Sequence, residues 1–235
     1  MDAPTRLLIH GASGRMGQAL QRLCREGAGC QVVAAVSRKV GSRAIDGIPQ
    51  FAASELAGVP QFDVAIDFSL PEGFDRILEL CLQRGAPLAS GTTGLSSEQQ
   101  SALDAAATRI PLVWASNFSL GVAVLHDLVE RAARALPGWD CDIVEAHHAR
   151  KLDAPSGTAL TLGVAAGEGG ATPRYASIRA GDIVGEHLVQ FSGIGERIEL
   201  AHRATNRDIF ARGALHAARA LVGRAPGRYR VRDLI

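Results

Sequence analysis

The sequence lacks the features that mark metal-binding or nucleic-acid-binding proteins. Its cysteines form no CxxC pair, and no histidine cluster completes a zinc spacing around them. The cysteines are Cys24, Cys30, Cys81 and Cys141. We therefore expect buried or free thiols in a reducing compartment and no metal site. The formal net charge is only +1, so any attraction for an anion must be local, and neither nucleic acid nor an anionic membrane surface is an expected partner.

Long apolar runs and targeting segments are also missing. No stretch reaches the ~20 apolar residues that a membrane helix needs, and the short polar segment 1–6 is no signal peptide. We therefore predict a cytoplasmic protein. The chain contains no internal repeat and no low-complexity linker, and the glycine-rich stretch 163–170 is the one segment expected to be flexible.

The first half of the chain alternates between two kinds of pattern. Short apolar runs at 7–10, 31–36, 63–68, 87–90 and 111–115 predict buried strands. Helical spacing predicts helices over 15–24, 71–84 and 98–108. Strands that alternate with helices predict a parallel, doubly wound sheet.

The pattern changes after residue 118. We predict a helix over 120–136, a strand over 141–146 and a last helix over 207–222. Between 174 and 202 the chain reads as antiparallel strands with turns at Gly181, Gly185, Gly193 and Gly195. The expected fold is α/β: a Rossmann-like dinucleotide-binding domain of residues 1–118 plus 205–235, and a mixed α/β substrate-binding and oligomerisation domain of residues 119–204.

A glycine-rich turn lies between the first predicted strand and helix. It consists of Gly11, Ala12, Ser13, Gly14, Arg15, Met16 and Gly17. Glycines let the backbone approach a pyrophosphate, and the start of a helix attracts negative charge. The spacing is GxxGxxG and not GxGxxG, so a tight turn without a ligand stays an alternative at this point.

The second predicted strand ends without the acidic residue that binds ribose hydroxyls in NAD-selective sites. Ser37 stands there, followed by Arg38 and Lys39. Both cations would suit the 2′-phosphate of NADPH, although they could equally be solvated surface charges. We therefore expect NADPH to be favoured modestly and NADH to be accepted.

Two further segments follow predicted strands and are small and polar. The first is Gly91, Thr92, Thr93 and Gly94, and the second is Ala115, Ser116, Asn117, Phe118 and Ser119. Ligands of open parallel sheets bind outside the carboxyl ends of the strands. Each segment alone could be an ordinary turn.

The densest motif is EAHHARKLDAPSGTA, which spans residues 145–159. His147, His148 and Lys151 lie within five residues just beyond a predicted strand. Gly157 and Thr158 then open a helix, whose first N–H groups point at an anion. Cations and helix N–H groups that converge in this way match a small substrate with carboxylates.

This motif resembles the signature of the 4-hydroxy-tetrahydrodipicolinate reductase family. GASGRMG, GTTG, ASNFS and RAGDIVGEH follow in the family's order, so the resemblance covers nearly the whole chain. It implies that His147 is an acid/base and Lys151 a proton donor, that His148 contacts substrate, and that Gly157 and Thr158 bind a carboxylate. Gly11 to Met16, Arg38, Gly91 to Thr93 and Ala115 to Phe118 would hold NADPH or NADH.

The resemblance further implies a homotetramer, with the glycine-containing strands after Arg174 as the candidate interface. Closure of the domains over both ligands is expected, because hydride transfer needs a dry, ordered site. The chain departs from the family at Ser37 and in a shortened segment after Thr158. Which of His147 and Lys151 transfers the proton stays open. Two alternatives remain: another NAD(P)-dependent small-acid dehydrogenase, such as an aspartate or amino-acid dehydrogenase, and a non-catalytic dinucleotide-sensing module.

Overall fold

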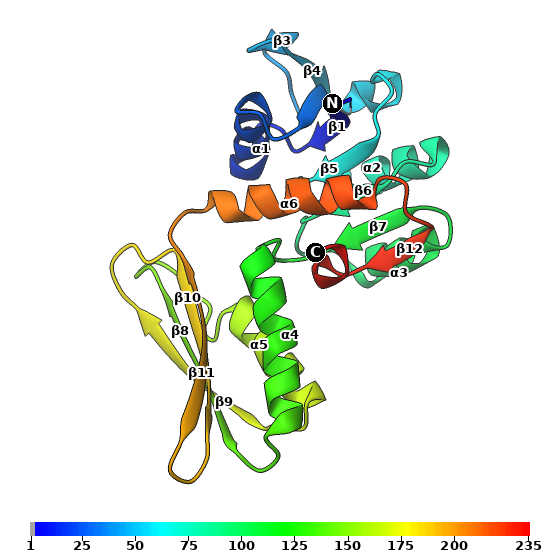
Figure 1. Cartoon of the computed structure of the whole chain (residues 1–235). Helices are drawn as coiled ribbons and strands as arrows, with labels where there is room; N and C mark the ends of the chain where they lie inside the picture. The colour runs from blue at the N-terminus through cyan, green and yellow to red at the C-terminus, as the bar shows by residue number, and fades with distance from the viewer. Residues whose placement is uncertain (1–2) are drawn as a thin grey trace. The chain divides into compact units, whose positions relative to one another are not determined.

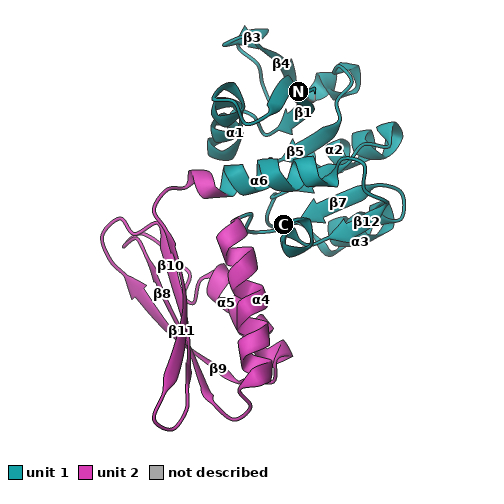
Figure 2. Cartoon of the chain, in the orientation of Figure 1, with its two compact units in different colours: residues 1–118, 210–235 teal, residues 119–209 magenta. Residues whose placement is uncertain are grey.

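The computed structural model describes residues 3–235, which divide into two compact units. Unit 1 runs to Phe118 and takes up the chain again at Phe210–Ile235, and unit 2 is Ser119–Ile209 (Figure 2). The first two residues of the polar segment 1–6 lie outside the described part of the chain. No helix among the described residues is long and apolar enough to span a membrane.

Unit 1 is built on an eight-stranded sheet in the order β12-β7-β6-β5-β1-β2-β4-β3 (Figure 1). Its strands are β1 Thr5–His10, β2 Cys30–Ser37, β3 Ala44–Ile45, β4 Ile48–Ala52, β5 Val64–Asp67, β6 Leu88–Ser90, β7 Pro111–Trp114 and β12 Gly227–Tyr229. All neighbours pair in parallel except β3 and β4. The strand order reverses between β1 and β5, which is the crevice where such sheets bind ligands.

Helices cover both faces of this sheet. They are α1 Arg15–Arg25, α2 Pro71–Arg84, α3 Ser97–Ala107 and α6 Asp208–Leu221, with short 3₁₀ segments η1 Ala53–Gly58 and η2 Val231–Leu234. Phe74 and Ile77 of α2 and Leu103 of α3 join Leu8 and Leu88 of the sheet in one apolar core. With helices on both faces the parallel sheet is buried on both sides, which explains why strands such as β1 and β5 read as continuous apolar runs.

Unit 2 is a four-stranded sheet, in the order β11-β10-β8-β9, with two helices. Its elements are α4 Leu120–Ala135, β8 Asp140–His147, α5 Gly157–Glu168, β9 Pro173–Arg179, β10 Gly185–Ser192 and β11 Arg197–Ala204. Leu125 and Val129 of α4 and Leu162 of α5 pack on Ile143 and Val189 of the sheet. One face of the sheet is therefore the apolar inner face.

The Rossmann-like α/β fold is as predicted, but several expectations for unit 2 are wrong. The stretch 163–170 is not a flexible segment, because α5 runs through it to Glu168. Gly163 has a packing reason: a Cβ there would meet the Tyr175 hydroxyl at 1.7 Å. The strands after residue 174 are not all antiparallel, since β9 pairs in parallel with β8. Gly185 begins β10 and does not form a turn.

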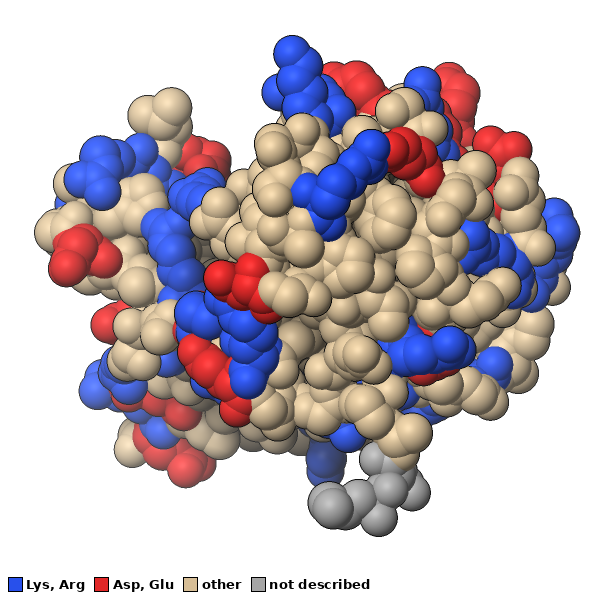
Figure 3. All heavy atoms as spheres, turned by 90° about the horizontal axis from the view of Figure 1, so that it is seen from above, with Lys and Arg blue, Asp and Glu red and all other residues tan. Residues whose placement is uncertain are grey.

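The elements β3, β4, β12 and the two 3₁₀ segments were not predicted from the sequence. These elements have two to six residues, too few to show a periodicity. The four cysteines are free and buried, as expected. On the face drawn in Figure 3, Lys and Arg are interspersed with Asp and Glu among wide uncharged areas, as the formal net charge of +1 suggests.

Candidate functional site

The glycine-rich turn of unit 1, called the glycine cradle below, brings backbone segments so close together that side chains at its glycine positions would clash with them. Gly11 has a φ of +82°, and a Cβ there would lie 2.3 Å from the backbone oxygen of Phe68. A Cβ on Gly17 would lie 2.4 Å from the oxygen of Gly11. Gly14 is the N-cap of α1 and offers no side-chain cap. The turn therefore fits the pyrophosphate of a dinucleotide, which needs close backbone approach and a helix N-terminus.

Ser37 is tied to this turn. Its hydroxyl accepts a hydrogen bond from the backbone N–H of Ser13 at 3.0 Å, and its side chain is buried. The N–H groups of Gly11 and Ala12 both donate to Val36. The residue that occupies the usual ribose-binding position thus shapes the glycine turn.

A cavity of about 730 Å³ adjoins the turn within unit 1. It is lined by Ser13 and Arg15 at the start of α1, by Ser37 and Lys39 after β2, and by residues of the β3–β4 region. Arg15 and Lys39 make no ion pair with any described residue. Arg38 is exposed and does not line this cavity. Of the two cations after Ser37, Lys39 is therefore the one that faces it.

The loops after β5 and β6 are organised by one buried carboxylate, Asp67. Its Oδ1 accepts from His10 Nδ1 at 2.9 Å, and its Oδ2 accepts from the hydroxyls of Ser90 and Thr92 at 2.8 and 2.7 Å. The backbone N–H of Ser69 donates to Oδ1 at 3.2 Å. Burial raises the pKa of Asp67, but its bonds to His10, Ser69 and Thr92 outweigh burial and leave that pKa below its usual value. The ends of β1, β5 and β6 are thereby fixed to one another.

The predicted cofactor loops differ in how they expose their residues. Thr92 is 1% exposed and bonded to Asp67, whereas Thr93 is exposed. A Cβ on Gly91 would lie 2.1 Å from the ring of Phe68, and that ring packs edge-on against Phe118 at 5.7 Å between centroids. Ala115, Ser116 and Asn117 follow β7, with Ser116 exposed. The predicted cofactor residues therefore lie at the carboxyl ends of strands of unit 1 or, for Arg15 and Met16, in the first turn of α1.

In unit 2 the long motif begins on the inner face of the sheet with a carboxylate–histidine pair. Glu145 and His147 stand two residues apart on β8, and Glu145 Oε2 lies 2.5 Å from His147 Nδ1. Arg179, at the end of β9, donates to both oxygens of Glu145 at 2.9 and 2.6 Å. Burial raises the pKa of Glu145, but the bonds from Arg179, Ser177 and His147 outweigh it and bring that pKa to about 2. Because an ionised carboxylate only accepts, Nδ1 of His147 carries its proton and Nε2 is left for other partners.

Two further histidines join this group. His187 of β10 stacks edge-on against His147 at 5.2 Å between centroids, and its Nε2 lies 3.1 Å from the hydroxyl of Ser156, the N-cap of α5. Nε2 of His202, on β11, lies 3.3 Å from the hydroxyl oxygen of Ser119, the N-cap of α4. Burial lowers the pKa of His187 to about 4, with His147 and His202 contributing. His187 is therefore neutral at physiological pH.

The remaining predicted residues lie in the segment between β8 and α5. Lys151 Nζ contacts both oxygens of Asp153 at 2.8 Å. Burial lowers the pKa of His148, and the charges of Arg207 and Arg150 lower it further. Gly157 and Thr158 are the first two residues of α5. Several positive charges and a helix N-terminus thus belong to one part of unit 2, which favours an anionic ligand.

Sequence reasoning missed the partners of these residues. Glu145 and Ser156 stand inside the quoted motif, and the two-residue spacing of Glu145 and His147 on a strand places both on one face. That spacing was a readable signal. Arg179 and His187 are the first and last residues of the RAGDIVGEH segment quoted above, but no role was predicted for either, because only the pairing of β8 with β9 and β10 brings them to Glu145. Arg207 is also far away in the sequence.

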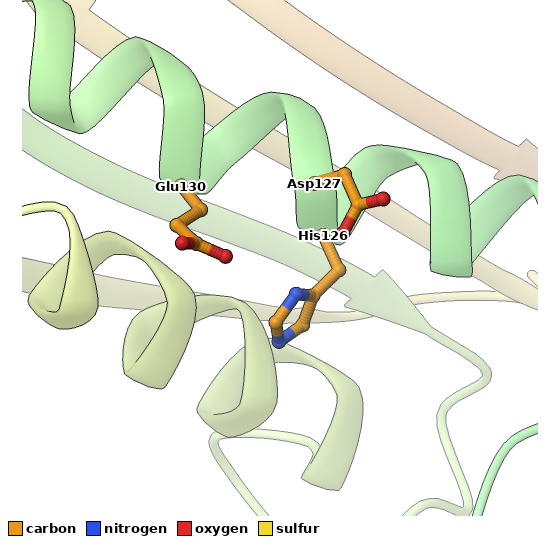
Figure 4. A group of neighbouring side chains, drawn as sticks. All are labelled: His126, Asp127 and Glu130. Atoms are coloured by element: carbon orange, nitrogen blue, oxygen red, sulfur yellow. The ribbon is translucent and has the colours of Figure 1, made fainter. Parts of the chain in front are cut away.

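One group on α4 has the geometry of metal ligands. The ligand atoms of His126, Asp127 and Glu130 lie within 4.8 Å of one another (Figure 4). Glu130 is already paired with Arg134 at 2.7 Å, and the three half-buried residues all belong to one helix. We assign no metal to it.

Comparison with known proteins gives the family. The model described as "Dihydrodipicolinate reductase, N-terminus" matches residues 5–118, and the one described as "Dihydrodipicolinate reductase, C-terminus" matches residues 121–235. A 4-hydroxy-tetrahydrodipicolinate reductase of Stenotrophomonas maltophilia is 75% identical over 100% of this chain and 99% of its own. The enzyme of the same name from Xylella fastidiosa is 67% identical over 100% of both chains.

Solved structures agree on the fold. A dipicolinate-bound dihydrodipicolinate reductase from Paenisporosarcina sp. superposes with a TM-score of 0.83 at 23% identity, over 99% of this chain and 100% of that one. An aspartate dehydrogenase from Thermotoga maritima reaches a TM-score of 0.53 at 16% identity, over 95% of this chain and 99% of that one. The aspartate dehydrogenase thus shares the fold alone, whereas the two reductases match this chain over its full length. The chain belongs to the dihydrodipicolinate reductase family.

Proposed function

We propose that this protein is an NAD(P)H-dependent oxidoreductase that reduces 4-hydroxy-tetrahydrodipicolinate, after loss of water, to tetrahydrodipicolinate in the diaminopimelate route to lysine. The observation that carries the proposal is the full-length identity of 75% to a reductase of that name. The glycine cradle of unit 1 and the His147–Glu145 pair of unit 2 supply chemistry that such a reaction needs.

Unit 1 would hold the cofactor. Gly11 to Met16 would bind the pyrophosphate at the start of α1, and Gly91 to Thr93 with Ala115 to Phe118 would bind at the strand ends near the nicotinamide. When bound, the reduced nicotinamide supplies a hydride. Arg15 and Lys39 line the cavity beside Ser37, and together with Arg38 they support a modest preference for NADPH over NADH, because cations attract the 2′-phosphate.

Unit 2 would hold the substrate, a small cyclic dicarboxylate. Its carboxylates would bind at the start of α5, to Gly157 and Thr158, and near His148, which lies among the charges of Arg207, Arg150 and Lys151. A co-crystal with pyridine-2,6-dicarboxylate tests this assignment. Carboxylates found beyond hydrogen-bonding distance of both Gly157 and Thr158 would contradict it.

The electron-rich carbon left after hydride addition must be protonated. Lys151, held by Asp153, would give that proton or stabilise the developing negative charge. His147 would act as the second acid or base through Nε2, since Glu145 engages Nδ1.

A homotetramer is proposed through the outer face of the unit 2 sheet. The strand register puts Val144, Ala176, Ile178, Leu188 and Ala201 on that face. Ile178 is 49% exposed, and no helix of unit 2 packs over this side in the described structure. An apolar sheet face of this kind is typical of subunit interfaces. Sedimentation equilibrium measures the assembly directly.

A coupled assay tests the activity. A dihydrodipicolinate-forming synthase generates the unstable substrate, and the purified protein is added with NADPH. We expect rapid loss of reduced-cofactor absorbance that depends on both proteins. Oxidation of L-aspartate or of diaminopimelate with NADP⁺ in place of that activity would identify a dehydrogenase on the same scaffold, and cofactor binding without any turnover would identify a sensing module.

A further inference from the structure

Arg179 joins two parts of unit 2 that are separate in the sequence. Its side chain is only 18% exposed, and its guanidinium donates to Glu145 Oε1 and Oε2. The nitrogen Nη2 also donates to the backbone oxygen of Asp153 at 2.7 Å. One cation therefore binds the carboxylate beside His147 and the segment whose aspartate holds Lys151.

Glu145 extends the same connections to α5. Its side chain is fully buried, and Oε1 accepts from the backbone N–H of Ser156 at 3.2 Å. Ser156 is the N-cap of the helix that Gly157 and Thr158 begin. The Glu145–Arg179 ion pair thus contacts His147, the backbone beside Lys151 and the turn at the start of α5.

We propose that the Glu145–Arg179 ion pair is the positioning element of the reaction. It holds His147 with Nδ1 protonated and keeps Lys151 and the start of α5 in register with it. The proposal rests on the proposed function, because His147, Lys151 and the α5 turn take their roles from it. Neither Glu145 nor Arg179 transfers a proton in this scheme.

The surroundings of His147 Nε2 support this role. No described residue hydrogen-bonds to Nε2, and a Cβ on Gly185 would lie only 3.1 Å from it. Glycine at this position leaves Nε2 accessible. An imidazole that is anchored at one nitrogen and open at the other is the arrangement that proton transfer needs.

A purely structural role explains the ion pair less well. The strands β8 and β9 are already in register from Cys141↔Pro173 to His147↔Arg179. A second arginine, Arg174, makes a similar two-pronged bond from β9 to Asp142 of β8, at 2.7 and 2.8 Å, but on the outer face of the sheet, away from His147. Buried ion pairs contribute little net stability compared with apolar pairs of similar volume, so a structural purpose would not require a charged pair on the inner face.

The test compares Arg179→Lys with Arg174→Lys in the coupled assay. Lysine keeps the charge of Arg179 but loses the planar fork that fixes the carboxylate. We expect kcat of the Arg179→Lys protein to fall about 10- to 100-fold, the range for partners that orient a reactive group, with an unchanged Kd for NADPH. Arg174→Lys should keep its kcat. If Arg179→Lys keeps kcat within about twofold of wild type, the proposal is overturned.

Two further measurements separate positioning from folding. Guanidinium ions added to Arg179→Ala should restore part of the lost kcat, whereas sodium ions at equal ionic strength should not. In nitrogen-15 NMR, His147 should be the Nδ1–H tautomer in the wild type and a mixture in Glu145→Gln. The same tautomer in both proteins would overturn the proposal even if Arg179→Ala did not fold.

Failure of the roles proposed for His147 and Lys151 would give a different result. If His147→Asn and Lys151→Ala both turn over substrate at the wild-type rate, the roles assigned to His147 and Lys151 are wrong. If those variants are inactive and the Arg179 and Glu145 variants are fully active, only the positioning proposal is wrong.

Discussion

Each unit contains a buried carboxylate bonded to a histidine, yet the two pairs differ in their other partners. In unit 1, Asp67 binds His10 and otherwise only neutral donors from Ser69, Ser90 and Thr92. In unit 2, Glu145 binds His147 and the guanidinium of Arg179. His10 and Asp67 are 4% and 0% exposed, and His147 is 9% exposed. In both pairs the histidine is bound through Nδ1, but only the carboxylate of the second pair is also bound by a cation.

The two units also differ in their buried side-chain atoms that have no hydrogen-bond partner. Within residues 3–235, the buried side-chain atoms that lack a hydrogen-bond partner are His148 Nδ1, Arg179 Nε, His187 Nδ1 and His202 Nδ1, all in unit 2. Buried polar groups are normally paired, so a cluster of exceptions marks a functional region. The two units therefore offer a ligand different groups. Unit 1 offers backbone N–H groups at the start of a helix, and unit 2 offers titratable side chains.

Lys151→Ala should have the largest effect and should separate the units most clearly. We expect kcat to fall by about 10²-fold or more, because a group that acts mainly in the transition state appears in kcat. The Kd for NADPH should not change, since Lys151 belongs to unit 2. Steady-state kinetics and fluorescence titration measure both quantities. A near wild-type kcat would reduce Lys151 to a surface charge paired with Asp153.

Asp67→Asn should act through folding and cofactor binding. An amide places a donor against the hydroxyls and the ring that now donate to Asp67, so we expect a loss of about 2–4 kcal/mol in the free energy of unfolding. NADPH should bind more weakly because the loops after β1 and β6 loosen. Asp63→Asn is the matched control, since Asp63 pairs with the exposed Arg6 and should cost less than about 1 kcal/mol. Urea unfolding measures both losses, and an equal loss of stability in the two variants would contradict the special role of Asp67.

His187 predicts a pH dependence specific to unit 2. Its folded pKa is about 4 against an ordinary value of 6.5, so the unfolded chain binds more protons between these values. The free energy of unfolding therefore falls by on the order of 2 kcal/mol as the pH falls from about 6.5 toward 4. In His187→Asn, urea midpoints between about pH 5 and 7 should lose this slope. An unchanged slope would place the titrating group elsewhere.

Cofactor selectivity should give the smallest effect. Lys39→Ala should weaken NADPH binding by about 0.2–1 kcal/mol and leave NADH nearly unchanged, because an exposed charge contact contributes little. Arg38→Ala should have the same direction and a smaller size, since Arg38 does not line the cavity. Dissociation constants for both cofactors check this. Equal losses for NADPH and NADH would mean that these side chains shape the loop and do not read the 2′-phosphate.

The sequence by itself determined the elements that have a period and the motifs that are continuous. Alternating apolar runs and helices led to the parallel sheet of unit 1, because each strand and helix there carries its own pattern. The glycine turn and the 145–159 motif could be found because all their residues are neighbours in the chain. The N-caps Ser96 and Ser156 directly precede the helices that they cap, because capping is a local interaction.

Only the tertiary structure decided the rest. The strand β9 pairs in parallel with β8, and this pairing brings Arg179 to Glu145. The two residues are 34 positions apart in the sequence, so their bond depends on the register of the two strands. Gly163 sits inside a helix because Tyr175 packs over it, which no local propensity encodes. Glu145 is ionised because the bonds from Arg179, Ser177 and His147 outweigh burial, and His187 is neutral chiefly because it is buried. Long-range packing sets these properties, since charge and desolvation act through space and not along the chain.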